Sequence, residues 1–377
     1  MNLTLVISSL ERGGAERVIS VLAGAWVERG RQITLITFDD AEGPAYQLHP
    51  GIVLRSLHIP NEFAKNNFYA LHRNVRRVRL LRRLIRQSQP DVVLSFLDFP
   101  NIITLLATRG LGIPVIVSER ANPEHDELKP IWKLARSLLY PQAAALVCQT
   151  NAMLVQLQGK IKVRGHAIPN PVEIPATLNS NSPKGGSADS RTLVAMGRLV
   201  PQKGFDLLLE AFARIAGKYP AWSIKILGKG ALRSQLQTQA ESLGLKNRVS
   251  FAGAVFDPFP ILRAADLFVF SSRFEGFGNA LTEAMACGLA AISFDCPAGP
   301  SDIIRHGVDG LLVPPEDVAG LASAMDRLMG DTDERERLAR RAPDVLTRFS
   351  LDSVIGKWEK VLNEVLPSPA GPDNKTN

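Results

Sequence analysis

The stretch DLFVFSSRFEGFGNALTEAMACGLAAISFD, residues 266 to 295, has the pattern of a strand, a turn, a helix and a second strand. An apolar run over 266–272 predicts a strand, and a glycine-containing turn follows it. Residues 279–287 have the spacing of a helix that ends at Gly288, and 290–295 predicts a second strand. Both strand runs are apolar at consecutive positions, which is typical of parallel strands that are covered on both faces.

The same alternation of strand and helix occupies most of the chain. In the first half, strands are predicted at 3–8, 32–38, 52–57, 91–97, 114–119 and 144–149, and helices at 15–29, 68–87, 100–109 and 130–140. In the second half, strands are predicted at 192–197, 223–228, 249–253, 266–272, 290–295 and 310–315, and helices at 204–217, 231–243 and 279–287. We therefore expect an α/β protein with two Rossmann-like, doubly wound parallel sheets.

The boundary between the two halves is marked by a change in composition. Residues 171–190 concentrate Pro, Asn, Ser and Gly, which predicts a linker. We expect a first domain at 1–170, a second at 191–350, an amphipathic helix at 351–366 that crosses back to the first domain, and a disordered tail at 367–377. Ligands of such sheets bind outside the carboxyl ends of the strands, so we expect a ligand in a cleft between two facing domains.

Composition restricts the class of protein. Of the 377 residues, 45% are hydrophobic and 21% are charged, as in globular rather than disordered proteins. The start, MNLTLVISS, has no basic leader, and its apolar run is too short for a signal peptide or a membrane span. We therefore expect a cytoplasmic protein. Cys148, Cys287 and Cys296 lack metal-ligand and CxxC spacing, which predicts buried thiols.

The positive charge is concentrated in the first half. Residues 1–170 contain 21 Lys and Arg against 13 Asp and Glu, and the stretch 71–87 contains seven arginines and no acid. Its apolar residues recur at steps of three and four: Leu71, Val75, Val78, Leu81 and Ile85. This spacing predicts an amphipathic helix with a basic exposed side.

Two interpretations of this basic helix stay open. It is either a solvated surface helix or a contact with an anionic membrane surface through Arg76, Arg79 and Arg83. Neither an interleaved aromatic platform nor a zinc or helix-turn-helix motif accompanies the arginines, so nucleic acid is not expected as a partner.

Turns at the carboxyl edges of the predicted sheets carry the candidate site residues. Arg198 and Lys203 follow a strand and form a plausible clamp for a diphosphate. Gly228 allows a flat base to lie against the backbone. In the first half, Gly13 and Gly14 open a helix whose N-terminus favours an anion, although a tight turn explains the two glycines nearly as well.

The turn inside the opening stretch carries two carboxylates. Glu275 can bind hydroxyls beyond a bound phosphate, and Glu283, one turn into the helix, can bind hydroxyls such as a ribose diol. The helix start between them offers N–H groups that suit phosphate oxygens. The residues expected to bind a ligand with these groups are Gly228, Gly276, Phe277, Gly278, Asn279, Ala280 and Glu283. Alternatively, Glu283 is a helix-dipole acid and Glu275 a solvated loop residue.

These motifs resemble a known family. The Glu-x7-Glu spacing in EGFGNALTEAMACGLAAISFD, after GRLVPQKGFDLLLEAF and before GPSDIIRHGVDGLLVPPED, resembles the retaining nucleotide-sugar glycosyltransferases of family 4, which have the GT-B fold. The resemblance extends over nearly the whole chain, including ISSLERGGAER and IPNPV. It implies transfer of a sugar from a nucleotide diphosphate donor with retention of anomeric configuration.

The resemblance also implies residue roles. Residues matching Glu275, Arg198 and Lys203 carry catalysis: the first contacts the donor sugar, and the two cations neutralise the diphosphate. The residue matching Glu283 holds the ribose, and Gly13 and Gly14 would lie by the phosphate and acceptor. A DxD-like metal pair is not evident, and fixed cations make a metal dispensable, so we expect no cofactor.

One departure from the family concerns the acceptor side. Where family members often have a His in a context such as SEH, this chain reads VSERANPEHDE, with Arg120 in that place. Glu119 remains, and His125 lies five residues beyond Arg120. We place Glu119 and Arg120 on the acceptor and phosphate side, and leave open whether Arg120 or His125 replaces the His.

The acceptor and the donor are expectations from the same residues. The basic helix and the apolar residues near Phe63, Phe68 and Tyr69 suggest a lipid-linked or cell-envelope glycan, bound by a peripheral protein on the inner face of the cell membrane. The stretch DCPAGPSDII (295–304) resembles family members that make bacterial polysaccharide, such as lipopolysaccharide, or lipid-linked oligosaccharide from UDP-sugars. This favours a UDP-hexose or UDP-N-acetylhexosamine donor, with GDP-mannose as the alternative.

Two other hypotheses are weighed against this one. A UDP-sugar epimerase of the same fold would need catalytic acids in the first domain. A non-catalytic sugar-nucleotide or membrane-binding module would tolerate the loss of Glu275 and Lys203, and their retention counts against it.

Overall fold

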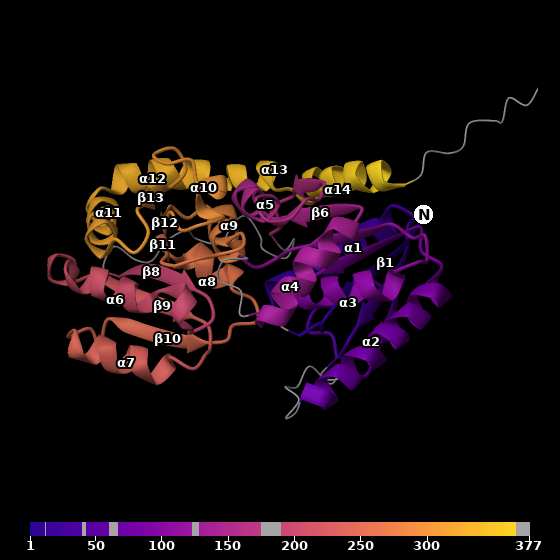
Figure 1. The fold of residues 1–377 in the computed structure, drawn as a ribbon. Helices are drawn as coiled ribbons and strands as arrows, with labels where there is room; N and C mark the ends of the chain where they lie inside the picture. Colours follow the sequence, from indigo (N-terminus) through magenta and orange to yellow (C-terminus); the bar gives the residue numbers. More distant parts are fainter. Residues whose placement is uncertain (12, 40–42, 60–66, 123–127, 175–189, 367–377) are drawn as a thin grey trace, which may run out of the picture. The chain divides into compact units, whose positions relative to one another are not determined.

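The computed structural model describes residues 1–11, 13–39, 43–59, 67–122, 128–174 and 190–366 (Figure 1). The chain divides into two compact units. Unit 1 comprises Met1–Asn170 with Leu351–Asn377, and unit 2 comprises Pro171–Ser350. Most of the predicted linker, residues 175–189, and the predicted tail, 367–377, lie outside the described residues.

Unit 1 is built on a parallel sheet. Within the described residues its seven strands have the order β3-β2-β1-β4-β5-β6-β7. They are β1 (Asn2–Ile7), β2 (Gln32–Thr37), β3 (Ile52–Ser56), β4 (Val92–Phe96), β5 (Val115–Ser118), β6 (Ala145–Cys148) and β7 (Gly165–Ala167). The order runs outward in both directions from the β1–β4 pair, so right-handed crossovers place helices on both faces. The doubly wound sheet is confirmed.

The helices of unit 1 include one from the far end of the chain. They are α1 (Gly14–Glu28), α2 (Asn67–Ser88), α3 (Asp98–Thr108), α4 (Pro130–Leu139), the 3-10 turn η1 (Tyr140–Gln142), α5 (Asn151–Gln158) and α14 (Leu351–Val365). Trp358 of α14 is fully buried, with its ring centroid 6.1 Å from that of Trp26 and 6.0 Å from that of Phe96. Aromatic packing therefore fastens α14 to α1 and to the end of β4.

Unit 2 repeats the same design. Its sheet, as far as the structure describes it, has six parallel strands in the order β10-β9-β8-β11-β12-β13. They are β8 (Arg191–Met196), β9 (Trp222–Leu227), β10 (Val249–Gly253), β11 (Leu267–Phe270), β12 (Ala291–Phe294) and β13 (Leu311–Val313). Here the order reverses between β8 and β11, which are neighbours in the sheet. Ligands of doubly wound sheets bind at such a reversal, outside the carboxyl ends of the strands.

The helices of unit 2 are more numerous than the sequence pattern predicted. They are η2 (Pro201–Lys203), α6 (Phe205–Ala213), η3 (Ala216–Lys218), α7 (Arg233–Ser242), α8 (Phe259–Ala264), α9 (Asn279–Ala286), α10 (Pro300–Ile303), α11 (Val318–Gly330), α12 (Thr332–Arg341), η4 (Ala342–Asp344) and α13 (Val345–Arg348). Helices α8 and α10 to α13 were not predicted. Buried Leu208 and Phe212 of α6 and Leu321, Met325 and Leu328 of α11 pack in one core cluster with the sheet.

The basic helix α2 departs from its predicted amphipathic pattern. Leu81 and Ile85 are fully buried, as expected, but Leu71 is 65% exposed and the side chain of Arg77 is buried instead. The Arg77 guanidinium lies 5.2 Å from the ring centroid of Phe99. Stacking on an aromatic ring lets a planar cation be buried, which apolar spacing does not reveal. Burial and, to a smaller extent, the neighbouring charge of Arg73 lower the pKa of Arg77 to about 10 against the opposing effect of Asp39.

No helix in the described part of the chain is both long enough and apolar enough to span a membrane.

Candidate active site

The turns that follow β8 and β9 pack backbone against backbone. Gly228 has φ 145°, and a Cβ there would overlap the carbonyl oxygen of Gly197. A Cβ at Gly230 would likewise overlap the carbonyl of Leu199, whose N–H donates to the carbonyl of Lys229 at 3.0 Å. Only glycine allows this approach, so the two turns form one continuous main-chain surface at the carboxyl edge of the sheet.

Lys203 and Glu275 meet at the point where the strand order of unit 2 reverses. Lys203 ends η2 after β8, and Glu275 lies in the turn after β11, 72 residues later. The Lys203 Nζ lies 2.5 Å from the Glu275 Oε1, and the two side chains are only 15% and 8% exposed. Residues in the turns after two neighbouring strands therefore form one largely buried ion pair.

Main-chain contacts hold the two turns together. Gly204, at φ 58°, packs so closely on the Ser271 carbonyl that a Cβ would overlap it. The Ser271 hydroxyl donates to the Lys203 carbonyl at 2.9 Å, and the Gln202 side-chain amide donates to the Phe274 carbonyl at 2.9 Å. These partners were not among the residues predicted from the sequence, because their contacts are with main-chain atoms rather than with a ligand.

The glycine turn after Glu275 leads directly into α9. Gly276 and Phe277 are buried, and Gly278, at φ 112°, lies just before the first helical residue, Asn279. The Leu281 N–H donates to the Gly278 carbonyl at 3.0 Å. Ala280 is half-buried in this first turn, and the positive end of the helix lies in the turn that follows β11.

The two carboxylates of the predicted motif lie on either side of this helix start. Glu275 precedes the turn, and Glu283 lies one turn into α9 with its side chain largely buried. They are therefore separated by the α9 N-terminus, as the sequence predicted. The structure brings Lys203 to Glu275 but does not bring Arg198 to the pair. Arg198 is exposed, and its side chain makes neither a hydrogen bond nor an ion pair with any residue that the structure describes.

Cys296 lies beside this ion pair. Burial raises the pKa of its thiol to about 12, the Glu275 carboxylate adds to the increase, and the Lys203 ammonium opposes it. The thiol is therefore neutral at physiological pH. Cys148, Cys287 and Cys296 are all buried free cysteines, which confirms the prediction made for them. The described residues contain no group of three or more His, Cys, Asp or Glu placed to hold a metal ion.

The predicted glycines of unit 1 follow β1, at the reversal of its strand order. Gly13 is extended, with φ −161°, and α1 begins at Gly14. The Tyr46 hydroxyl donates to the Gly13 carbonyl at 3.1 Å, and a Cβ on Gly13 would overlap the Glu16 carboxylate. The overlapping atoms are the far end of a flexible side chain and the backbone is extended, so this contact alone does not require glycine at position 13.

Glu119 and Arg120 follow β5 and are both buried. The Tyr140 hydroxyl donates to the Glu119 carboxylate. Arg120 donates from Nη1 to the Asn170 Oδ1 at 2.7 Å, and its guanidinium lies 4.4 Å from the Phe96 ring centroid. Burial lowers the pKa of Arg120 to about 9. His125, the other predicted candidate, lies outside the described residues.

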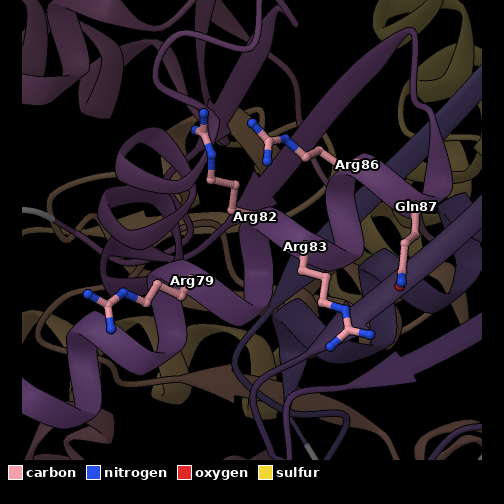
Figure 2. Close-up of a pocket in the computed structure, with 5 residues that line it drawn as sticks. All are labelled: Arg79, Arg82, Arg83, Arg86 and Gln87. Atoms are coloured by element: carbon pink, nitrogen blue, oxygen red, sulfur yellow. The ribbon is translucent and has the colours of Figure 1, made fainter.

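The exposed side of α2 carries the predicted membrane contacts. Arg76, Arg79 and Arg83 are exposed. Figure 2 shows the residues that line a pocket along this helix, Arg79, Arg82, Arg83, Arg86 and Gln87, with side chains that point in different directions. Arg82 donates to the carbonyls of Ala107 and Arg109, both at 2.8 Å.

The apolar residues predicted near this helix are only partly described. Tyr69 is exposed, whereas Phe63 and the side chain of Phe68 lie outside the described part of the chain.

Comparison with known proteins covers both units. A family model described as Glycosyltransferase Family 4 matches residues 12–174, and one described as Glycosyl transferases group 1 matches residues 179–345. The chain is 29% identical over 371 residues to a Campylobacter jejuni protein named GalNAc-alpha-(1->4)-GalNAc-alpha-(1->3)-diNAcBac-PP-undecaprenol alpha-1,4-N-acetyl-D-galactosaminyltransferase. The match covers 97% of this chain and 99% of that protein.

A second relative is matched over a part of its length. The chain is 36% identical over 290 residues to an exopolysaccharide phosphotransferase of Streptomyces coelicolor, which covers 76% of this chain and 30% of that protein. Among solved structures, Anabaena HepE in complex with UDP and glucose is similar, with a TM-score of 0.75 and 20% identity over 96% of this chain and 99% of that one. Together with the two parallel sheets, this similarity confirms the predicted GT-B fold.

Proposed function

This chain belongs to the family 4 glycosyltransferases, and we propose that it moves a sugar from a nucleotide diphosphate donor to a lipid-linked or cell-envelope glycan with retention of anomeric configuration. Our first choice of donor is a UDP-hexose or UDP-N-acetylhexosamine, on the resemblance of residues 295–304 to UDP-sugar enzymes. The Campylobacter relative, by its name, acts on an undecaprenol-linked glycan, which supports a lipid-linked acceptor.

The observation that carries this proposal is the buried Lys203–Glu275 pair beside the start of α9. When the bond between sugar and diphosphate breaks, the leaving diphosphate gains negative charge. A fixed ammonium and the N-terminus of α9 stabilise that charge, at about 3 to 4 kcal/mol for a well-aimed donor. Glu275 accepts hydrogen bonds from the sugar hydroxyls, and Glu283 accepts them from the ribose. Arg198, exposed at the end of the β8 turn, adds a second cation to the diphosphate.

On the acceptor side we place the Gly13–Gly14 turn with Glu119 and Arg120. Both features follow strands of unit 1 at the carboxyl edge of its sheet, where ligands of doubly wound sheets bind. Because α1 begins at Gly14, the turn presents a helix N-terminus that favours a negatively charged group.

We place the acceptor at the inner face of an anionic membrane. The exposed arginines of α2 supply charge complementary to anionic lipid, each worth about 1 kcal/mol near the surface. Helix α4, which packs against α3 as α2 does, exposes three apolar side chains at helical spacing. Ile131 is 70% exposed, Leu134 61% and Leu138 65%. A basic helix and an apolar helix on one unit suit an interfacial surface better than a solvated one.

The donor class is tested by thermal unfolding in the presence of UDP-, GDP- and ADP-sugars. A ligand at 100 times its dissociation constant stabilises the folded protein by about 2.7 kcal/mol. We expect UDP-sugars to raise the unfolding temperature of wild type, and to raise that of Lys203→Met much less. Stabilisation by GDP-mannose alone would make this a mannosyltransferase, and a lack of response to every nucleotide sugar would contradict the proposal.

Membrane contact is tested by sedimentation with anionic vesicles. We expect the triple substitution of Arg76, Arg79 and Arg83 by Gln to release the protein. A matched control removes the same charge from α12 through Gln at Arg337, Arg340 and Arg341, and should leave binding intact. Equal binding by both triple variants would refute the membrane contact.

A further inference from the structure

We propose that Arg273 is a positioning residue that holds Lys203 and Glu275 in register with one another. This inference deepens the proposed function, because it rests on the same ion pair as the donor site. Arg273 lies in the turn after β11, two residues before Glu275. Its side chain is 25% exposed.

The Arg273 guanidinium binds three residues from two separate segments of unit 2. Nη1 and Nη2 donate to the two carboxylate oxygens of Asp206, at 2.9 and 2.6 Å. Nη1 also donates to the Pro201 carbonyl at 2.8 Å, and Nε donates to Glu316 at 2.9 Å. One side chain from the turn that carries Glu275 therefore grips both ends of the segment that carries Lys203.

Two further hydrogen bonds connect the turn that carries Glu275 to the turn that carries Lys203. The Arg273 N–H donates to the Gln202 carbonyl at 2.8 Å, and the Gln202 side chain donates to the Phe274 carbonyl at 2.9 Å. Gln202 is the direct neighbour of Lys203, and Phe274 is the direct neighbour of Glu275. Each member of the ion pair is thus next to a residue that is bound across the gap between the turns.

The charges around Arg273 agree with a strong set of contacts. Burial alone would raise the pKa of Asp206, but the hydrogen bonds and charge of Arg273 outweigh it, and the pKa is lowered. The hydrogen bonds that Arg273 donates to Asp206 raise the pKa of Arg273 above its usual value. Glu316, the third partner, has φ 58°, which is uncommon for a residue with a side chain.

Register matters here because Lys203 and Glu275 come from different turns. A lysine side chain is long and flexible, so its ammonium is positioned only as well as the main chain beneath it. A displacement of about 1 Å in a reacting group can cost about 100-fold in rate. Four of the five guanidinium N–H groups of Arg273 are used within unit 2, so it acts through Lys203 and Glu275 rather than on the donor.

The first test measures the ion pair itself and does not depend on activity. The free energy of unfolding of unit 2 is measured for wild type, Lys203→Met, Glu275→Leu and the double variant, which gives the coupling between the two side chains. The same cycle is repeated in Arg273→Gln. We expect the coupling to fall by more than half. An unchanged coupling would overturn the inference.

A matched control separates positioning from the general loss of an ion pair. Arg327 binds Glu334 through Nε and Nη2, both at 2.6 Å, on α11 and α12 of the same unit. Arg327→Gln removes a similar two-point contact, and we expect it to leave the coupling unchanged. If Arg327→Gln reduces the coupling as much as Arg273→Gln does, positioning by Arg273 is refuted.

The second test measures transfer. Rates are normalised to the number of UDP-binding sites found by titration, so that unfolded protein does not count. We expect kcat to fall about 100-fold in Arg273→Gln, to recover partly in Arg273→Lys, and to stay within twofold of wild type in Arg327→Gln. Guanidinium at non-denaturing concentration should raise the rate of Arg273→Ala but not that of Arg327→Gln.

The two tests distinguish failure of this inference from failure of the proposed function. A coupling that is lost in Arg273→Gln, in a chain that transfers no sugar, supports the positioning and contradicts the function. A wild type that transfers sugar, with Arg273→Gln equally active per UDP-binding site, supports the function and overturns the inference.

Discussion

Replacing Lys203 and Glu275 singly and together should separate the stability of unit 2 from its activity. The Glu275 side chain is 8% exposed, so Lys203→Met should leave a buried carboxylate without its ammonium partner. Removing one partner of a buried ion pair costs about 3 to 5 kcal/mol, because the remaining charge is left uncompensated. Glu275→Leu should cost less than this range suggests, since the long Lys203 side chain can move its ammonium toward water.

The double variant Lys203→Met/Glu275→Leu should recover most of that loss. At the observed 2.5 Å, with an effective dielectric constant of about 20, the attraction of the pair is about 7 kcal/mol. Most of that attraction offsets the cost of removing both charges from water, so an apolar pair of similar volume should be about as stable as wild type. The double variant should nevertheless transfer no sugar, because both proposed donor contacts are gone.

The measurement must report unit 2 alone, since the chain has two units. Hydrogen exchange of the β8 and β11 amides under increasing urea gives the free energy of unfolding of that sheet. If the loss of unfolding free energy in the double variant equals the sum of the losses in the two single variants, the coupling is refuted. Transfer by the double variant at more than about a tenth of the wild-type rate would refute the site.

Three further predictions concern the packing of each unit. Gly228→Ala should destabilise unit 2 by about 2 to 4 kcal/mol in the same hydrogen-exchange measurement, because φ is 145° there and the Gly197 carbonyl occupies the space that a Cβ would need. The control Gly217→Ala places its Cβ in open space and should change the stability by less than about 1 kcal/mol. Trp358→Ala should cost unit 1 about 3 to 5 kcal/mol by urea unfolding, and a loss below about 1 kcal/mol would contradict the role given to α14. Burial lowers the pKa of His166, although its Nε2 lies 3.4 Å from the Glu364 Oε2, so its contribution to stability is complete above about pH 6.5 and is lost as pH falls. His166→Gln should therefore lose less stability than wild type between about pH 7.5 and 5.5. Equal slopes of unfolding free energy against pH in the two proteins would contradict this.

Long, uniformly apolar runs made the sheets predictable. Strands such as β4 and β12 are buried at every position, so their residues read as apolar on both faces, and the alternation with helices fixed the doubly wound class. Short elements were missed for the converse reason. The three-residue strand β7 and the four-residue helices α10 and α13 are too short to show a period.

The site was predictable where a glycine or a charge follows a strand, and unpredictable where a contact joins distant turns. Gly228, Glu275 and Lys203 could be placed at the carboxyl edge from the local pattern alone. That Lys203 and Glu275 form an ion pair could not, because 72 residues separate them. Arg273 appears in the sequence as an ordinary loop cation, and only its partners in space reveal what it holds.

The family resemblance was confirmed by the two family models, whereas the roles of individual residues are still predictions. The burial of Arg77 shows why charge patterns need a structure. Its position within a basic stretch indicated an exposed side chain. The guanidinium is instead buried against the rings of Phe38, just after β2, and Phe99, in α3.

The most direct test of the proposed donor site is a transfer assay with the purified chain. The donors are UDP-hexoses or UDP-N-acetylhexosamines, and the acceptor is a saccharide linked to a polyprenyl diphosphate. Mass spectrometry shows whether one sugar is added, and NMR of the product gives the anomeric configuration. We predict that wild type adds one sugar with the configuration of the donor and that Lys203→Met adds none. A product of inverted configuration, an epimerised donor without transfer, or full transfer by Lys203→Met would contradict the account.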